Sequence, residues 1–369
     1  KYLWIKIMAY SSITKPEEYF NTKLYTGGNG SATTISGLDF APDFAWCKDR
    51  EGTGVHALMD RLRTGSYGHG WLRTDVSGSP ADPENNTNGR GNISSFTSDG
   101  YVLSADTWGA SNQGTTNHVA WNWRAGGSGS SNSNGSITST VSANTTAGFS
   151  IVSYTGTGSA ATIGHGLGVK PDAILVKNRD ASQNWFVYQK ALDASAPEDY
   201  YILLSGAAVR VNDATAWNDT APTTSVFSVG SNDATNKSSD KHIAYCFVGI
   251  KGYSKFGSYV GNGNADGAFV YTGFKPAWVM LKANDSDNWY VKDNKRDVDN
   301  PVITQLFPNL SNADNTNSVS YLDFLSNGFK LRGTDSGING NGNTNFYFAF
   351  AENPFVGNDS GTAVPVTAR

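Results

Sequence analysis

The sequence predicts an all-β protein made of three tandem β-sandwich (jelly-roll-like) repeats with a short N-terminal helix. Three observations support this fold class. The 369 residues include 41 glycines and 12% aromatic residues, a mixture typical of short strands joined by polar turns. The apolar runs are β-branched and aromatic, and Gly, Asn, Asp and Ser bound them. The third observation is an internal repeat, which indicates that one unit occurs three times.

Each copy of the repeat has a Tyr-x-Gly turn, then a proline, then an apolar strand that ends in lysine. In every copy the tyrosine precedes the proline by 17 positions, and the proline precedes the lysine by 6. Each copy then closes with an aromatic strand, at 118–123, 242–247 and 347–352. The anchors are Tyr25, Pro42 and Lys48; Tyr154, Pro171 and Lys177; and Tyr259, Pro276 and Lys282.

The recurrence of Tyr-x-Gly in all three copies favours a role in folding. We expect Tyr154 to end a strand and bury its ring, and Gly156 and Gly158 to supply the positive φ of a turn. A phosphate-binding loop is excluded, because the turn has neither the required lysine nor a following helix.

The repeat also predicts the domain organisation. A short helix is expected in the N-terminal segment, where Thr14 and Glu17 form a capping box around Pro16. The short spacer between the second and third repeats predicts that they pack together. We expect the natural chain to start at Met8, with residues 1–7 upstream of it. The predicted boundaries are an N-terminal segment at 1–19, repeats at 20–127, 149–250 and 251–356, a flexible or loosely packed Gly/Ser/Asn linker at 128–148, and a C-terminal tail at 357–369.

Charge, hydropathy and cysteine content limit the classes of partner and the covalent links that the sequence allows. The net charge of −4 and the pI of about 5.7 argue against nucleic acid, which requires clustered Lys and Arg. Membrane insertion is not expected, since no apolar run approaches the roughly 20 residues of a membrane span. Cys47 and Cys246 cannot make a disulfide framework, so we expect both to be reduced and packed as small apolar groups.

No cofactor or catalytic residue is predicted. The five histidines have no metal-ligand spacing. The acidic and amide-rich loops 231–236 and 284–289 could hold Ca²⁺ through side-chain oxygens, although neither matches a full calcium loop. Glycoside hydrolysis would require two neighbouring carboxylates, and His56 lacks an accompanying nucleophile motif. The carboxylates considered for such a pair are Asp60, Asp75, Asp106 and Asp219.

Sugar recognition would use flat aromatic faces framed by amide and carboxylate groups. Repeated aromatic residues such as Trp185 and Trp289 are expected to be framework. Unrepeated tryptophans in polar loops are better candidates, with the alternative that each folds back over the sandwich edge or is buried between chains. The loop 334–345 of the third repeat lacks a tryptophan and is expected to bind weakly or not at all. The predicted carbohydrate-binding residues are Trp108, Asp106, Trp217, Asn218, Asp219 and Trp71.

Several long segments resemble the repeated β domains of bacteriophage tail and tail-fibre proteins from marine phages and prophages. The segments are 148–180, 215–230, 244–282 and 323–344, together with 8–27 and 358–369. The resemblance implies a virion protein that is made in the host cytoplasm and meets glycans at the host surface. It also implies other virion proteins as partners and a homo-oligomer, which we expect to be a trimer. It implies no catalytic residues.

Three functions remain open after this reading. The first is a lectin-like tail adhesin that binds bacterial surface polysaccharide through loops on rigid strands. The second is a glycan-cleaving tail enzyme, such as a depolymerase or glycosidase. The third is a purely structural component of the virion.

Overall fold

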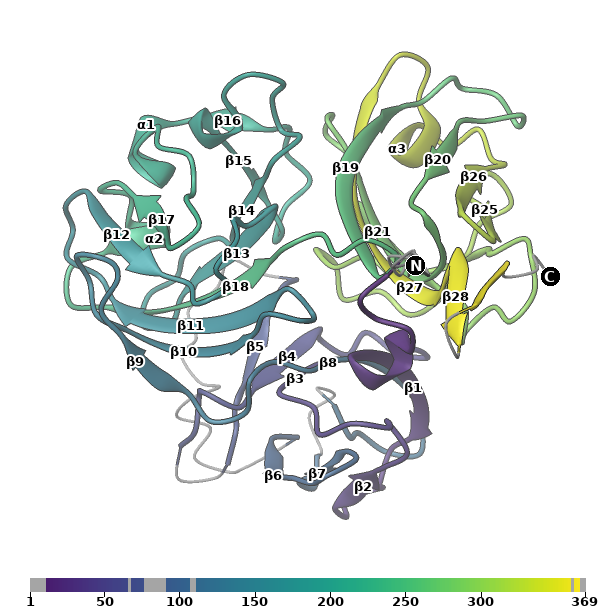
Figure 1. The fold of residues 1–369 in the computed structure, drawn as a ribbon. Coiled ribbons are helices and arrows are strands. Elements are labelled where there is room, and N and C mark those ends of the chain that lie inside the picture. Colours follow the sequence, from purple (N-terminus) through teal and green to yellow (C-terminus); the bar gives the residue numbers. More distant parts are fainter. Residues whose placement is uncertain (1–10, 66–67, 76–90, 107–110, 360–361, 366–369) are drawn as a thin grey trace, which may run out of the picture.

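The computed structural model describes residues 11–65, 68–75, 91–106, 111–359 and 362–365. The prediction of an all-β chain is confirmed, because the named strands form antiparallel sheets and the helices are single turns. Figure 1 shows three lobes around a common centre. We define the first lobe as residues 20–123, the second as 130–247 and the third as 254–354.

The first lobe has a main sheet in the order β1-β8-β3-β4-β5 and a smaller sheet in the order β2-β7-β6. A 3₁₀ turn, η1 (Pro16–Glu18), precedes it. The strands are β1 (Phe20–Thr26), β2 (Thr33–Ile35), β3 (Phe44–Asp49), β4 (Ala57–Asp60), β5 (Trp71–Arg73), β6 (Ile93–Phe96), β7 (Tyr101–Leu103) and β8 (Asn117–Trp123).

The second lobe has an eight-stranded sheet in the order β16-β15-β14-β13-β18-β11-β10-β9, and β12 pairs with β17. Its strands are β9 (Ser130–Asn132), β10 (Ser139–Asn144), β11 (Phe149–Thr155), β12 (Ala161–Gly164), β13 (Ala173–Asn178), β14 (Phe186–Gln189), β15 (Tyr200–Leu203), β16 (Val211–Asn212), β17 (Val226–Val229) and β18 (Lys241–Phe247). Its helical turns are η2 (Pro197–Asp199), α1 (Ala214–Trp217) and α2 (Asp233–Asn236).

The third lobe has a main sheet in the order β19-β27-β21-β22 and smaller sheets β20-β26-β25 and β23-β24. Its strands are β19 (Ser254–Val260), β20 (Phe269–Tyr271), β21 (Phe274–Ala283), β22 (Trp289–Asp293), β23 (Thr304–Gln305), β24 (Asn315–Thr316), β25 (Leu322–Leu325), β26 (Gly328–Leu331) and β27 (Thr344–Pro354). Helix α3 (Ser336–Asn339) lies before β27, and the hairpin β28 (Val356–Asp359) and β29 (Thr362–Pro365) follows it.

The three main sheets share a four-strand order, in which the closing aromatic strand lies between the strand that carries the tyrosine and the strand that follows or contains the proline. This order is β1-β8-β3-β4, β11-β18-β13-β14 and β19-β27-β21-β22. The tyrosines also have equivalent partners across the first pair of strands. Tyr25 pairs with His118, Tyr154 with His242 and Tyr259 with Asn345.

A buried asparagine anchors each Tyr-x-Gly turn. Its Oδ1 accepts the backbone N–H of the third residue after the tyrosine, and its Nδ2 donates to two backbone carbonyls. The tyrosine hydroxyl donates to the carbonyl of the residue before the asparagine. The pattern therefore explains the recurring tyrosine as part of the fold. The asparagines are Asn112, Asn236 and Asn339.

The glycines of this turn have two different roles. Gly158 has a φ of +74°, as predicted. The predicted positive φ is wrong for Gly156, which is absent from the residues with positive φ. A Cβ on Gly156 would lie 2.2 Å from the carbonyl oxygen of Lys237, and a Cβ on Gly27 would lie 2.2 Å from that of Gln113. Close backbone approach is therefore the reason for glycine at this position.

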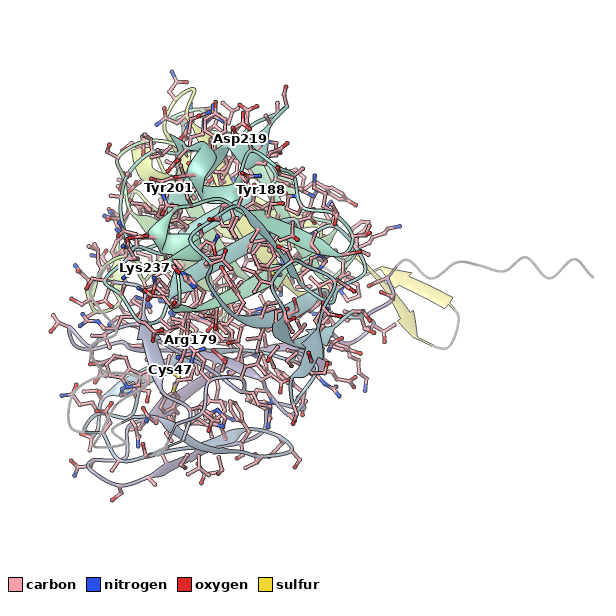
Figure 2. The ribbon with its side chains drawn as sticks, turned by 90° about the vertical axis from the view of Figure 1, so that its left-hand side faces the viewer. Cys47, Arg179, Tyr188, Tyr201, Asp219 and Lys237 are labelled. Carbon is pink, nitrogen blue, oxygen red and sulfur yellow. The ribbon has the colours of Figure 1, made fainter. Side chains whose placement is uncertain are left out.

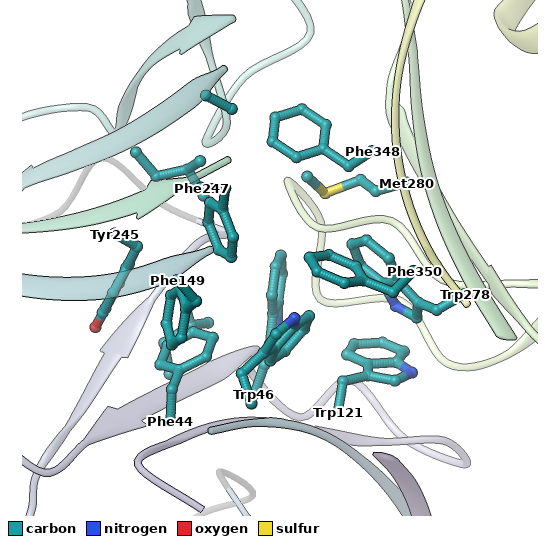
Figure 3. Packing of buried hydrophobic residues seen from close by; sticks show 14 of the residues in the cluster. Phe44, Trp46, Trp121, Phe149, Tyr245, Phe247, Trp278, Met280, Phe348 and Phe350 are labelled. Atoms are coloured by element: carbon teal, nitrogen blue, oxygen red, sulfur yellow. The ribbon is translucent and has the colours of Figure 1, made fainter. Parts of the chain in front are cut away.

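The core is divided among the lobes and the centre. Each lobe buries a cluster between its main and smaller sheets, and a fourth cluster joins the other faces of all three main sheets. Figure 3 shows aromatic rings from the three sheets converging at this centre, among them Trp46, Phe247 and Phe350. Because both faces of the main sheets are buried, their central strands are apolar almost throughout.

Polar contacts join the lobes in a cycle. The Tyr245 hydroxyl of the second lobe donates to Asp60 of the first at 2.7 Å. Gln189 of the second lobe donates to the Gly257 carbonyl of the third at 2.9 Å. The Trp121 indole of the first lobe donates to Asp293 of the third at 3.1 Å. Each lobe thus contacts both others, and the ring is closed.

Two predictions about local structure are wrong. The segment 128–148 is not a flexible linker, because β9 and β10 extend the second main sheet through pairing with β11. Its serines and threonines suit an exposed sheet edge. The N-terminal helix is a 3₁₀ turn without a side-chain cap, and Lys15, not Thr14, is its N-cap residue. Pro16 is buried at its first position, as the sequence predicts.

Candidate functional site

The tryptophan predicted to bind sugar in the second lobe is buried. Trp217 is 2% exposed, and its indole N–H donates to the Tyr200 carbonyl at 3.1 Å. Asp213 caps α1 and turns this helix back over the lobe, so that the ring packs against Tyr188. The prediction that Trp217 presents a stacking face is therefore wrong.

The two residues after Trp217 are accessible. Asn218 and Asp219 are both exposed and have positive φ values of 57° and 41°. Figure 2 shows Asp219 at the upper edge of the second lobe. Without the ring beside them, these polar side chains form an ordinary solvated turn.

The only described ring of the predicted site in the first lobe is buried as well. Trp71 in β5 is 8% exposed and belongs to the core of this lobe. Asp106 is buried and accepts the backbone N–H groups of Ser111 and Asn112, which explains its position by folding. Trp108 lies outside the described residues.

The described residues offer neither a metal cluster nor a membrane-spanning helix. Within the described ranges, no group of three or more His, Cys, Asp or Glu side chains is arranged to hold a metal ion. In the loop 231–236, Asn232 uses its side chain to cap α2. No helix in the described part of the chain is long and apolar enough to cross a membrane.

A polar hollow in the third lobe is the best candidate for a binding site. Its volume is about 310 Å³, within the range of small-molecule sites. We call it the larger hollow. It lies between β21, the loop after β22, and β25. The residues that line it are Lys275, Asn294, Asp297, Val298, Asp299, Asn300, Val302 and Phe324.

The loop that forms the larger hollow is held by its own polar groups. Asp297 accepts the backbone N–H groups of Ile303 (2.8 Å) and Thr304 (2.6 Å), and also the Thr304 hydroxyl (2.8 Å). Asn300 exchanges two hydrogen bonds with the backbone of Phe324, both at 2.9 Å. These bonds preorganise the hollow before a ligand arrives.

A smaller hollow adjoins the larger one. Its volume is about 50 Å³, and Asn294 lines both hollows. Lys275 of the larger hollow forms an ion pair with Glu352 of the smaller one at 2.7 Å. The smaller hollow lies at the contact between the first and third lobes. Its residues are Glu17, Phe20, Asn21, Thr22, Ala277, Asn294, Lys295, Ala351 and Glu352.

The other two lobes fill the equivalent position with an ion pair. The residue after the anchor proline is Asp43 in the first lobe, where it pairs with Arg61 at 2.5 Å. In the second lobe it is Asp172, which pairs with Lys190 at 3.0 Å. The backbone N–H of each basic residue also donates to the carbonyl of its aspartate.

The third lobe keeps the backbone bond but lacks the ion pair. The N–H of Asn294 donates to the Ala277 carbonyl at 2.9 Å, in the same register as in the other lobes. Alanine has no carboxylate, so no ion pair can form here. Separately, Oδ1 of Asn294 is buried without a hydrogen-bond donor among the described residues. An unsatisfied polar atom of this kind destabilises the free protein by about 1–3 kcal/mol. The third lobe therefore has a hollow and an unused amide where its counterparts have a closed ion pair.

Thr22 provides a second unused group. Its hydroxyl is buried and has no hydrogen-bond partner within the described chain, and it lines the smaller hollow from β1. Two residues that line the smaller hollow thus each carry a buried polar atom without a hydrogen-bond partner among the described residues, which favours a polar guest.

This site has no aromatic ring in a polar loop, which is the sequence feature that predicted the tryptophan sites, and so it was not predicted. The sequence did contain one signal. The residue after the anchor proline is Ala277 in the third copy of the repeat, whereas the other copies have Asp43 and Asp172. The interaction that this difference removes, however, becomes visible only in the paired strands.

Comparison with known proteins identifies the family. Residues 15–354 match a family described as a domain of unknown function, DUF7483. The match covers most of the 369 residues, so the chain belongs to this family. No curated protein matches the chain.

Proposed function

We propose that this member of the DUF7483 family is a lectin-like protein that binds saccharide in the hollows of the third lobe. The observation that carries the proposal is that Ala277 and Asn294 stand where the other two lobes have an ion pair. Both residues line the smaller hollow, and Asn294 also lines the larger one. Saccharides offer hydroxyl groups that both donate and accept, and C–H faces that suit an apolar floor such as Val302 and Phe324.

Binding is favoured over cleavage by the state of the carboxylates. Hydrolysis needs two carboxyl groups free to act on the same bond. Of the two that line the larger hollow, Asp297 is committed to Ile303 and Thr304. Asp299 is exposed and remains available to a ligand. One free carboxylate in the larger hollow suits recognition of hydroxyl groups better than acid–base catalysis.

We place this activity on a phage tail, as the resemblance of the sequence segments suggests. The protein would be made in the host cytoplasm and would bind polysaccharide at the bacterial surface as part of the virion. We also propose that the three lobes are tandem copies of one jelly-roll-like unit, supported by their shared strand order and buried asparagines. A homotrimer in contact with other virion proteins would multiply weak sites by avidity.

A glycan array combined with a reducing-sugar assay tests the proposal. We expect binding without release of reducing ends. Product release would favour the glycan-cleaving alternative, and neither binding nor product would favour a purely structural component.

A plugged variant links the result to the hollow. The double substitution Ala277→Asp with Asn294→Lys rebuilds the ion pair of the second lobe, and it should reduce binding at least tenfold. The matched control is Asp172→Ala with Lys190→Asn, which removes the equivalent pair from the second lobe. This control should lose some stability and keep its binding. Equal binding by the plugged variant and the natural sequence would place any sugar site elsewhere.

A further inference from the structure

We propose that the two hollows form one groove for a linear oligosaccharide of neutral or amino-bearing sugars, with Asn294 between two subsites. This inference rests on the proposed function and specifies its ligand. The continuity of the groove is given by Asn294, which lines both hollows, and by the Lys275–Glu352 ion pair that joins their walls.

The sizes of the hollows assign them different parts of the ligand. The larger hollow, at about 310 Å³, has room for a whole sugar ring. The smaller hollow, at about 50 Å³, has room for only one or two groups of the size of a water molecule. It would therefore take a substituent or one edge of the next sugar. A monosaccharide would fill the larger hollow and leave the smaller one unused.

Two residues with unpartnered polar atoms line the smaller hollow. Thr22 is 5% exposed, and its Oγ1 has no hydrogen-bond partner in the described residues. Asn294 Oδ1 is also without one, and rotation of the amide about its terminal torsion exchanges its donor and acceptor. A hydroxyl or amine of the second sugar would satisfy both groups.

The charges of the groove select the class of sugar. Lys275 and Glu352 neutralise each other, and Asp297 is held by backbone N–H groups. Asp299, Glu17 and Lys295 remain, so the available charge is more negative than positive. Uronic acids and phosphate-bearing sugars would be repelled, whereas neutral sugars and protonated amines would be accepted.

The groove crosses a boundary between lobes. Phe20, Asn21 and Thr22 come from β1 of the first lobe, and Ala277 and Ala351 come from the third. Figure 1 shows the N-terminal part of the first lobe running beside the third lobe. A complete groove therefore requires the closed ring of lobes.

Calorimetric titration with a chain-length series tests the groove. The probes are N-acetylglucosamine and glucosamine oligomers of one to four residues, the same lengths of the strongest neutral glycan from the array, and oligogalacturonates as acidic controls. We expect affinity to rise at least tenfold between the monosaccharide and the trisaccharide of a neutral or amino series. The oligogalacturonates should bind more weakly than neutral oligomers of equal length.

The variant Thr22→Val locates the second subsite. It keeps the side-chain volume and removes the hydroxyl, so it should weaken the longer oligomers three- to tenfold and leave the monosaccharide unchanged. Thr26→Val, on the exposed end of the same strand, is the matched control and should change neither.

The possible outcomes separate the groove from the proposed function. The groove would be overturned if affinity did not depend on oligomer length, or if Thr22→Val bound every length as tightly as the natural sequence does. The third-lobe site would still stand in that case, provided that the plugged variant loses affinity. Tighter binding of the acidic series would overturn the charge assignment. No binding to any saccharide on the array or in the three series would overturn both proposals.

Discussion

The Tyr245→Phe substitution tests whether the lobes stabilise one another. The Tyr245 hydroxyl donates to Asp60 across the boundary between the second and first lobes at 2.7 Å, and both side chains are fully buried. Asp60 also pairs with Arg63 at 2.5 Å. Phenylalanine removes one donor to a buried carboxylate and leaves the ring in place. A hydrogen bond to a charged group contributes about 1.5–3 kcal/mol, so we expect a loss of roughly 2 kcal/mol in unfolding free energy.

The assay is urea denaturation followed by tryptophan fluorescence, with Tyr188→Phe as the control. The Tyr188 hydroxyl is also buried in the second lobe, but it has no hydrogen-bond partner among the described residues. Removing this hydroxyl should leave the unfolding free energy unchanged or raise it slightly, because no hydrogen bond is lost. Equal effects of the two substitutions, or a loss below about 0.5 kcal/mol for Tyr245→Phe, would refute the contribution of this contact to the closed ring.

The dependence of this effect on pH follows from Asp60. Burial alone would raise the pKa of Asp60, but the Arg63 charge and the Tyr245 hydroxyl outweigh it and hold the pKa below its ordinary value. A carboxylate with a lowered folded pKa contributes stability above its unfolded pKa and loses it as pH falls through the folded one. The difference between the natural protein and Tyr245→Phe should therefore shrink in acid.

Three further predictions concern the fold. Burial lowers the pKa of Lys292 to about 7 and the pKa values of Lys48, Lys177 and Lys282 to about 8. Above these pH values the unfolded chain binds more protons than the folded protein does. The unfolding free energy should therefore rise between pH 7 and pH 9. The rise should be on the order of 1 kcal/mol or more and smaller in Lys292→Met, and a fall over this range in urea denaturation would contradict it. Asn236→Ala should lower the unfolding free energy by about 3 kcal/mol, because it leaves the Thr157 N–H and the Ser159 and Gly230 carbonyls without their partner. A loss under about 1 kcal/mol would show that the turn does not depend on Asn236. Cys47 and Cys246 are free and buried, and burial raises the pKa of the Cys47 thiol to about 11, so neither should react with a disulfide reagent until the protein unfolds, and rapid labelling of the native protein would disprove this.

The sequence could predict what depends on local pattern. The constant spacing of Tyr25, Pro42 and Lys48 and their counterparts identified the paired strands, since strand-forming runs and glycine turns leave their mark within a few residues. The closed ring could not be predicted in the same way. Its contacts join residues as distant as Asp60 and Tyr245, and no local pattern specifies which lobe meets which.

The site was harder to predict for a related reason. A tryptophan in a polar loop looks exposed in the sequence, but Asp213 starts a single helical turn that buries Trp217. Ala277 and Asn294, which replace an ion pair, line the smaller hollow, and the walls of this hollow come from strands far apart in the sequence. Comparison of the residues that follow the three anchor prolines could have indicated the replacement of aspartate by alanine, but not the space beside it.

A crystal structure of the protein soaked with the strongest saccharide from the array is the most direct test of the third-lobe site. Our account predicts electron density for a sugar ring in the larger hollow, within hydrogen-bonding distance of Asn294 and Asp299. Density in another lobe, or at the loop around Trp108, with the larger hollow holding only water, would contradict it.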